Sequence, residues 1–175
     1  LQHNHAYLTW LDDVQNRYPN LILENCSSGG MRICYSLLSR HSVQSISDQT
    51  DYFRMAPIAA ACQAAIPPEQ AAAWTYPIPD NSRDAVIFNM INPMLMRIHL
   101  SGRPDQLSPE HLALVKQAIA YYKMIRKDIK QSLPFWPLGM PAFDDPWISL
   151  GLRYESRNYL AVWRMKTSEK SCHLP

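Results

Sequence analysis

The chain has 175 residues, of which 47% are hydrophobic and 18% are charged, a composition typical of globular proteins and not of disordered ones. A net charge of +2 gives no indication of a nucleic-acid or membrane partner, and no run of about 18 apolar residues indicates a membrane span. The four cysteines show neither the paired spacing of metal ligands nor a dense disulfide pattern, so we expect no metal and no cofactor.

Both ends of the sequence look cut. The chain begins at Leu1 inside a predicted helix, without an initiator Met, and it stops at Pro175 shortly after a strand-like run. We expect a cytoplasmic location, although a targeting segment could be missing at the N-terminus.

Helical and strand patterns alternate through the first hundred residues. In chain order, the patterns predict a helix at 5–18, a strand at 21–23, a helix at 31–40, a strand at 43–46, a helix at 52–66, a strand at 71–76, a helix at 83–94 and a strand at 96–100. Pro57 lies inside the third helix, and it should kink or restart that helix because proline has no backbone N–H.

The sequence changes character after residue 130. Ser108-Pro109-Glu110 is typical of a helix start, and the helix it opens should run to about Lys130. Four prolines follow within 133–146, and two antiparallel strands are then predicted at 147–152 and 159–165, joined through 155–158.

This order predicts an α/β protein with a parallel sheet. Four strand–helix units make up half of an eight-stranded TIM barrel, and a half-barrel with open edges is typical of a fragment. A small open parallel sheet is the alternative, but it does not explain the cut ends.

Two polar loops follow neighbouring strands of the predicted sheet. The turn Cys26–Gly30 comes after the first strand, and Ser47–Asp51 comes after the second. The carboxyl ends of parallel strands share one edge, so both loops should face the same opening. We interpret Asp48 as a catalytic carboxylic acid, with the glycine turn placing a sugar beside it. Thr50 or Asp51 could instead simply cap the next helix.

The glycine turn has a structural explanation as well as a functional one. Its adjacent glycines allow close approach of a ligand, and its N–H groups with Ser27 and Ser28 could bind hydroxyls or an anion. A Gly-Gly turn is also common for geometric reasons alone. Cys26 as a nucleophile would need a base, for which only His41 is close in sequence, and we disfavour this. Trp74 and Tyr76 could stack on a sugar, but core packing is the commoner role of aromatic residues.

The segments ENCSSGGMR, LLSR, SVQSISDQTDY and PPEQAAAW together resemble the retaining α-galactosidases of glycoside hydrolase family 36. Their order and spacing agree with that family across about Leu21 to Leu100. The resemblance implies a (β/α)8 barrel in which strands five to eight are Leu21–Asn25, Val43–Ser47, Ala71–Tyr76 and Met96–Leu100. Residues 1–132 would then be a partial catalytic barrel, and 133–175 the linker and first strands of a C-terminal antiparallel β-domain.

The resemblance also implies a site. Asp48 would be the general acid/base, the residues Cys26, Ser27, Ser28 and Gly29 would line the galactose subsite, and Arg32 and Asp51 would support them. Hydrolysis would proceed by double displacement between two carboxyl groups about 5–5.5 Å apart.

Two departures from the family pattern stand out. The nucleophile of the family is an aspartate in a Lys-Trp-Asp type motif, which is absent here, and Asp12 and Asp13 lie in a helical context that does not replace it. Relatives usually carry Asp at the position of Cys34, so Arg32 could lack its partner. We therefore expect the isolated chain to be inactive.

Three functions remain open at this point. The leading one is an α-galactosidase acting on oligosaccharides such as melibiose and raffinose, with an α-galactoside as its partner, no nucleic acid, no membrane, and a homo-oligomeric full-length parent. The second is a galactosyltransferase of the raffinose and stachyose synthase type. The third is a non-catalytic sugar-binding or assembly fragment.

Overall fold

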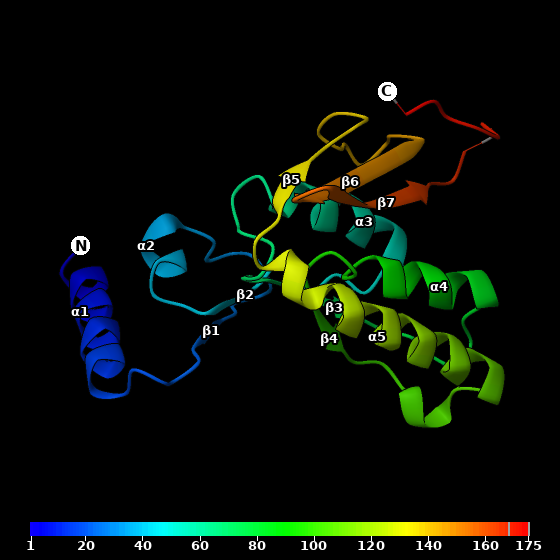
Figure 1. The fold of residues 1–175 in the computed structure, drawn as a ribbon. Coiled ribbons are helices and arrows are strands. Elements are labelled where there is room, and N and C mark those ends of the chain that lie inside the picture. Colours follow the sequence, from blue (N-terminus) through cyan, green and yellow to red (C-terminus); the bar gives the residue numbers. More distant parts are fainter. Residues whose placement is uncertain (168, 175) are drawn as a thin grey trace.

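The computed structural model describes residues 1–167 and 169–174 and contains two sheets (Figure 1). The parallel sheet has the order β1-β2-β3-β4, formed by β1 (Glu24–Asn25), β2 (Val43–Ser45), β3 (Ala71–Thr75) and β4 (Arg97–Leu100). The antiparallel sheet has the order β5-β6-β7, formed by β5 (Leu133–Phe135), β6 (Trp147–Tyr154) and β7 (Arg157–Arg164). The prediction of an α/β chain with a parallel sheet and a later antiparallel one is thus confirmed.

The helices connect the parallel strands and then lead to the second sheet. They are α1 (Gln2–Arg17), α2 (Tyr35–Leu38), α3 (Tyr52–Cys62), α4 (Arg83–Ile91), the short 3-10 helix η1 (Pro104–Gln106) and α5 (Pro109–Ile129). Side-chain caps begin three of them, because Asp51, Ser82 and Ser108 each accept a hydrogen bond from a free N–H of the first turn. The predicted start of the last helix at Ser108 is confirmed.

The parallel sheet is strongly curved. Glu24 on β1 and His99 on β4 belong to the two edge strands, which the usual strand spacing would place about 14 Å apart in a flat sheet. The Oε1 of Glu24 nevertheless lies 3.7 Å from the Nδ1 of His99. Side chains from opposite edges can meet in this way only across a concave face.

Helix α3 lies between the two sheets and contributes to a separate core on each side. Met55 and Ala59 pack with residues such as Ala73 of the parallel sheet. Ala56 and Ala60 pack instead with residues of the antiparallel sheet and of α5, including Leu150. Alanine allows a helix to approach a sheet closely, and Figure 1 shows α3 directly beneath β5, β6 and β7.

Polar contacts also attach the antiparallel sheet to the helices. The indole Nε1 of Trp136 donates a hydrogen bond of 2.8 Å to the carbonyl of Ala60 on α3. The carboxylate of Asp128 on α5 accepts from the hydroxyl of Tyr159 and pairs with Arg157 at 3.0 Å, both on β7. The second sheet is therefore held by both helices.

The first parallel strand and the helix after it are much shorter than predicted. The expected strand at Leu21–Asn25 pairs only at Glu24–Asn25, and Leu21 and Ile22 remain 46% and 72% exposed. Because β1 is an edge strand, these residues have no second neighbour to pair with. The helix expected at 31–40 is a single turn at Tyr35–Leu38, and residues 31–34 before it are not helical. The nearby Gly30 leaves no room for a Cβ, which would lie 2.6 Å from the Ile46 carbonyl oxygen.

Two prolines and one tight turn also bear on the predicted elements. Helix α3 runs through Pro57 without restarting, although Pro57 cannot donate the usual hydrogen bond. The Pro-rich segment contains β5, an edge strand in which Pro134 is tolerated. The loop between β6 and β7 has only two residues, Glu155 and Ser156, with Glu155 at φ 50°.

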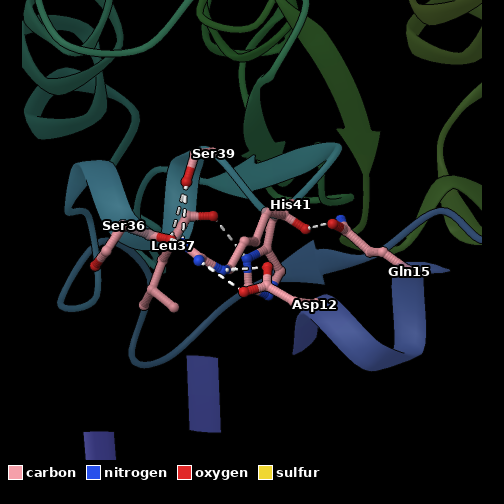
Figure 2. Close-up of polar contacts among 7 residues, drawn as sticks. Asp12, Gln15, Ser36, Leu37, Ser39 and His41 are labelled. Carbon is pink, nitrogen blue, oxygen red and sulfur yellow. Dashed lines mark hydrogen bonds and ion pairs between the residues drawn. The ribbon is translucent and has the colours of Figure 1, made fainter. Parts of the chain in front are cut away.

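Figure 2 shows how α1 is attached to the segment around α2. The guanidinium of Arg40 contacts both carboxylate oxygens of Asp12, at 2.7 and 2.9 Å, and also donates to the Ser36 carbonyl at 2.9 Å. Gln15 donates to the Arg40 carbonyl. The hydrogen bonds from Arg40 hold the pKa of Asp12 below its ordinary value, so this carboxylate serves as an ion-pair partner within the fold.

In the part of the chain that the structure describes, no helix combines the length and the apolar character needed to cross a membrane.

Candidate active site

The glycine turn after β1 rests directly on the backbone of the loop after β2. A Cβ placed on Gly29 would lie 2.4 Å from the Cα of Ser47 and 2.5 Å from the backbone N of Asp48. Gly29 also has φ +70°, a conformation that favours glycine. The two loops that the sequence placed at one opening are therefore in contact, and no larger residue fits between them.

The loop that carries Asp48 is braced by its own side chains. The hydroxyl of Ser47 accepts a hydrogen bond of 3.1 Å from the N–H of Gln49, and the Oε1 of Gln49 accepts one of 2.9 Å from the N–H of Asp51. Asp48 lies between these contacts with its side chain exposed. The arrangement holds the backbone and leaves the carboxyl group of Asp48 open to a ligand.

Asp51 begins the next helix. Its Oδ1 accepts from the N–H groups of Phe53 at 2.9 Å and of Arg54 at 3.3 Å, which makes it the N-cap of α3. Of the two roles considered for Asp51, the structure thus shows helix capping, and its part in the site is to fix where the Asp48 loop ends.

The buried side-chain amides of Asn25 and Gln44 hydrogen-bond to each other and to the backbone around the glycine turn. The Nδ2 of Asn25 donates to the Oε1 of Gln44 at 2.6 Å and to the carbonyl of Arg32 at 3.1 Å. The Nε2 of Gln44 in turn donates to the carbonyls of Asn25 and Ser45. Sequence reasoning missed this pair, although two amide residues inside short predicted strands were a usable signal, because buried amides need partners.

Tyr76 is an aromatic residue near the two loops. It follows β3 directly, and its backbone N–H donates to the Oδ1 of the buried Asn89 at 3.3 Å. Partial burial raises the pKa of the Tyr76 phenol, and the nearby charges of Asp48 and Cys26 raise it further. The phenol is therefore in electrostatic range of both loops. The position of Tyr76 after a strand was the signal for this role, but no pattern in the sequence distinguishes it from core packing.

A layer of polar side chains lies on the concave face, one step below the site. The Nε1 of Trp74 donates to the Oγ of Ser45 at 3.1 Å, and its ring meets the ring of His99 edge-on at 4.8 Å. Since Glu24 also reaches His99, each parallel strand contributes one residue to the layer. Trp74 is thus engaged within the sheet, and Tyr76, two residues further along, is the aromatic residue at the opening.

Arg32 and Cys34 lie on the far side of the turn. Both line a separate cavity of about 480 Å³ between α1 and the segment around α2, and Arg32 makes no ion pair with any carboxylate among the described residues. His41 is buried, and its Nδ1 lies 2.8 Å from the carbonyl of Leu37. His41 therefore serves the fold around α2 and is not oriented as a base for Cys26.

The cysteines should differ strongly in reactivity. Hydrogen bonding, first from Ser36 at 3.2 Å, lowers the pKa of the exposed Cys34 thiol, whereas burial raises the pKa of Cys62 to about 12. Cys62 is half-buried as a residue, but its Sγ points inward and donates to the Ala59 carbonyl. Because the thiolate is the reactive species, iodoacetamide at pH 8 should modify Cys34 first and Cys62 about a thousandfold more slowly than an ordinary thiol.

Peptide mass spectrometry over a time course measures these rates. Ser36→Ala should slow the labelling of Cys34 and leave the rate of the exposed Cys26 unchanged, which makes Cys26 an internal control. Equal rates at Cys34 and Cys62 would contradict the environments described for these two thiols.

Among residues 1–167 and 169–174, no group of three or more His, Cys, Asp or Glu side chains is arranged to hold a metal ion.

Several solved α-galactosidase structures contain a region with the same fold. The galactosidase domain of the α-galactosidase–sucrose kinase AgaSK aligns with a TM-score of 0.80 and 20% identity, over 94% of this chain and 23% of that one. Variants of the family 36 α-galactosidase AgaA from Geobacillus stearothermophilus, solved with raffinose and with stachyose, each align with a TM-score of 0.79 over 93% of this chain and 23% of theirs, at 18% and 19% identity.

The chain thus spans slightly less than a quarter of the length of these solved relatives. No individual curated protein matches the chain significantly. Residues 2–132, which carry the glycine turn, the Asp48 loop and the helices up to α5, match the family model described as melibiase, and the chain belongs to that family.

Proposed function

We propose that the natural protein containing this chain is a retaining α-galactosidase that removes terminal α-galactosyl residues from oligosaccharides such as melibiose and raffinose. The observation that carries the proposal is the packing of Gly29 on the backbone of Ser47 and Asp48. This contact places the glycine turn, which could face sugar hydroxyls, next to the loop that presents the exposed carboxyl group of Asp48. The chain that carries both belongs to the melibiase family.

The proposal includes an assignment of the fold. The four parallel strands would be strands five to eight of a (β/α)8 barrel, with the barrel portion at 1–132 and the first strands of a β-domain at 133–175. The sequential order β1-β2-β3-β4 supports this, because barrel strands follow one another around the sheet. The contact between Glu24 and His99 across the concave face supports it as well.

In the proposed reaction, Asp48 acts first as an acid and then as a base. It donates a proton to the glycosidic oxygen while a second carboxylate attacks the anomeric carbon, and it then removes a proton from the water that releases galactose. Ser27, Ser28 and the N–H groups up to Gly29 would face the galactose hydroxyls. Tyr76 closes the site beside them.

The attacking carboxylate would come from outside these 175 residues. Asp12 is engaged with Arg40 and lies on α1, away from the Asp48 loop. The chain on its own should therefore show no measurable turnover of any α-galactoside, and robust activity of the isolated chain would refute the placement of the nucleophile.

The natural protein offers a direct test. Proton NMR of the first product formed from melibiose should show α-galactose, which then mutarotates, because two displacements retain the configuration. Initial β-galactose would exclude the proposed mechanism. With excess sucrose present, formation of a trisaccharide in preference to free galactose would identify a galactosyltransferase instead.

A further inference from the structure

A groove of about 520 Å³ extends outward from the candidate site, and the proposed hydrolysis does not account for it. It is lined by Thr50 and Asp51, at the end of the loop that carries Asp48, and by Tyr76, and it passes the start of α3 and the loop after β3. Residues from three separate parts of the chain line it, among them Tyr52, Phe53, Tyr76, Ile78, Asn81 and Lys166.

The aromatic wall of the groove is held firmly in place. The rings of Tyr52 and Phe53 lie 4.7 Å apart, and each packs against Phe88 of α4, at 5.2 and 4.8 Å. Three mutually packed rings from two helices form a surface that does not need to reorganise when a ligand binds.

Lys166, in the segment after β7, adds a charged group to the same wall. The Nζ of Lys166 lies 4.9 Å from the centre of the Phe53 ring, over its face. Lys166 makes no ion pair with a carboxylate of the described residues, although it also lines a second cavity together with Asp51, Asp144 and Asp145. The ammonium therefore keeps N–H donors that can reach a ligand in the groove.

The floor supplies a further polar group. The Oδ1 of Asn81 accepts from the N–H of Ile78 at 3.1 Å and from the Nδ2 of Asn89 at 3.5 Å. Within the described residues, the Nδ2 of Asn81 has no acceptor, so its two N–H groups can serve a hydroxyl of the ligand.

We propose that this groove binds the neutral sugar units of an oligosaccharide that lie beyond the galactosyl residue, and that Lys166 and Phe53 set the preference for such extended substrates. The aromatic rings of Tyr52 and Tyr76 suit the apolar faces of sugar rings, while the N–H donors of Lys166 and Asn81 suit their hydroxyls. Thr50 and Asp51 line the groove and belong to the loop that carries Asp48, so the groove adjoins the candidate site, as an extended chain requires. The inference rests on the proposed function, since it assigns the leaving-group side of the same site.

The test compares two substrates of the natural protein that share the galactosyl unit. Lys166→Met keeps the aliphatic stem and removes the charge, and it should lower kcat/KM for raffinose about five- to tenfold, mainly through KM. Hydrolysis of α-galactosyl fluoride should change less than about twofold, because its leaving group is a single atom that cannot enter the groove. Lys170→Met, at an exposed position four residues further on, is the matched control and should leave both substrates unaffected.

A measurement of sucrose binding tests the groove independently of the proposed reaction. Saturation-transfer NMR should detect sucrose, the part of raffinose beyond galactose, on the natural protein, and Lys166→Met should weaken the signal. Unchanged sucrose binding in that variant, or equal losses on raffinose and α-galactosyl fluoride, would overturn the role of the groove. Failure to cleave any α-galactoside would refute the reaction, while sucrose binding would still test the groove.

Discussion

Asp48→Ala in the natural protein should slow the hydrolysis of raffinose about a hundredfold to ten-thousandfold, the usual contribution of a general acid or base. The sugar alkoxide of raffinose is a poor leaving group that needs the proton of Asp48. Fluoride leaves without protonation, so formation of the galactosyl-enzyme from α-galactosyl fluoride should remain fast. Steady-state kinetics on both substrates, with the burst of fluoride release, measure the difference.

The same variant should respond to azide. Without Asp48, water attacks the intermediate slowly because no base activates it, whereas azide is already an anion and needs no base. Added azide should therefore restore turnover of α-galactosyl fluoride and give a galactosyl azide of retained configuration. The side chain of Asp48 is exposed, so thermal unfolding of the variant should match that of the unmodified protein.

Asp51→Ser is a suitable control for Asp48→Ala, because serine is a comparable N-cap. It should keep the start of α3 and most of the raffinose activity. Equal losses of kcat/KM on raffinose and on the fluoride in Asp48→Ala, with no burst of fluoride release, would indicate that Asp48 has a structural role and would refute its role as acid.

Gly29→Ala should be the most damaging single methyl addition in the site. The new Cβ would lie 2.4–2.6 Å from backbone atoms of Ser47 and Asp48, and φ +70° would be strained for alanine. Strain of about 1–2 kcal/mol and overpacking of about 1–3 kcal/mol should together lower the free energy of unfolding by about 2–5 kcal/mol. Displacement of the Asp48 backbone should also lower kcat by about a hundredfold.

Gly139→Ala separates strain from contact. Gly139 has φ +85°, but a Cβ there would meet no atom within 4 Å, so this variant has the strain without the overlap. Chemical denaturation should show a loss of about 1–2 kcal/mol for Gly139→Ala, and kcat should be unchanged. Similar effects of the two variants on kcat would mean that the contact of Gly29 with the Asp48 loop does not matter for catalysis.

The sequence was informative wherever a local signal determines the structure. Ser108-Pro109-Glu110 predicted the start of α5 correctly, and the position of Asp51 before an apolar helix made capping a clear alternative. The shared edge of parallel strands predicted that the two polar loops would face one opening, and in the structure they are in contact.

Other features depend on contacts that are distant in the sequence. Strand β5 pairs Phe135 with Gly151, and a Cβ on that glycine would lie 2.2 Å from the Phe135 ring, so the ring occupies space that only the distant glycine leaves free. The short extent of β1 and the place of Tyr76 beside Asp48 likewise depend on how the strands assemble. No local pattern near these residues specifies that assembly.

Helix α3 connects the antiparallel sheet to the loop that carries Asp48. Ala56 and Ala60 touch one core, Met55 and Ala59 touch the other, and the N-cap of the same helix ends the Asp48 loop. The packing of α3 on the antiparallel sheet therefore helps to hold the start of this helix, where the Asp48 loop ends. Changes in the size of side chains on β6 or β7 should therefore shift the loop that carries Asp48, without any substitution in that loop.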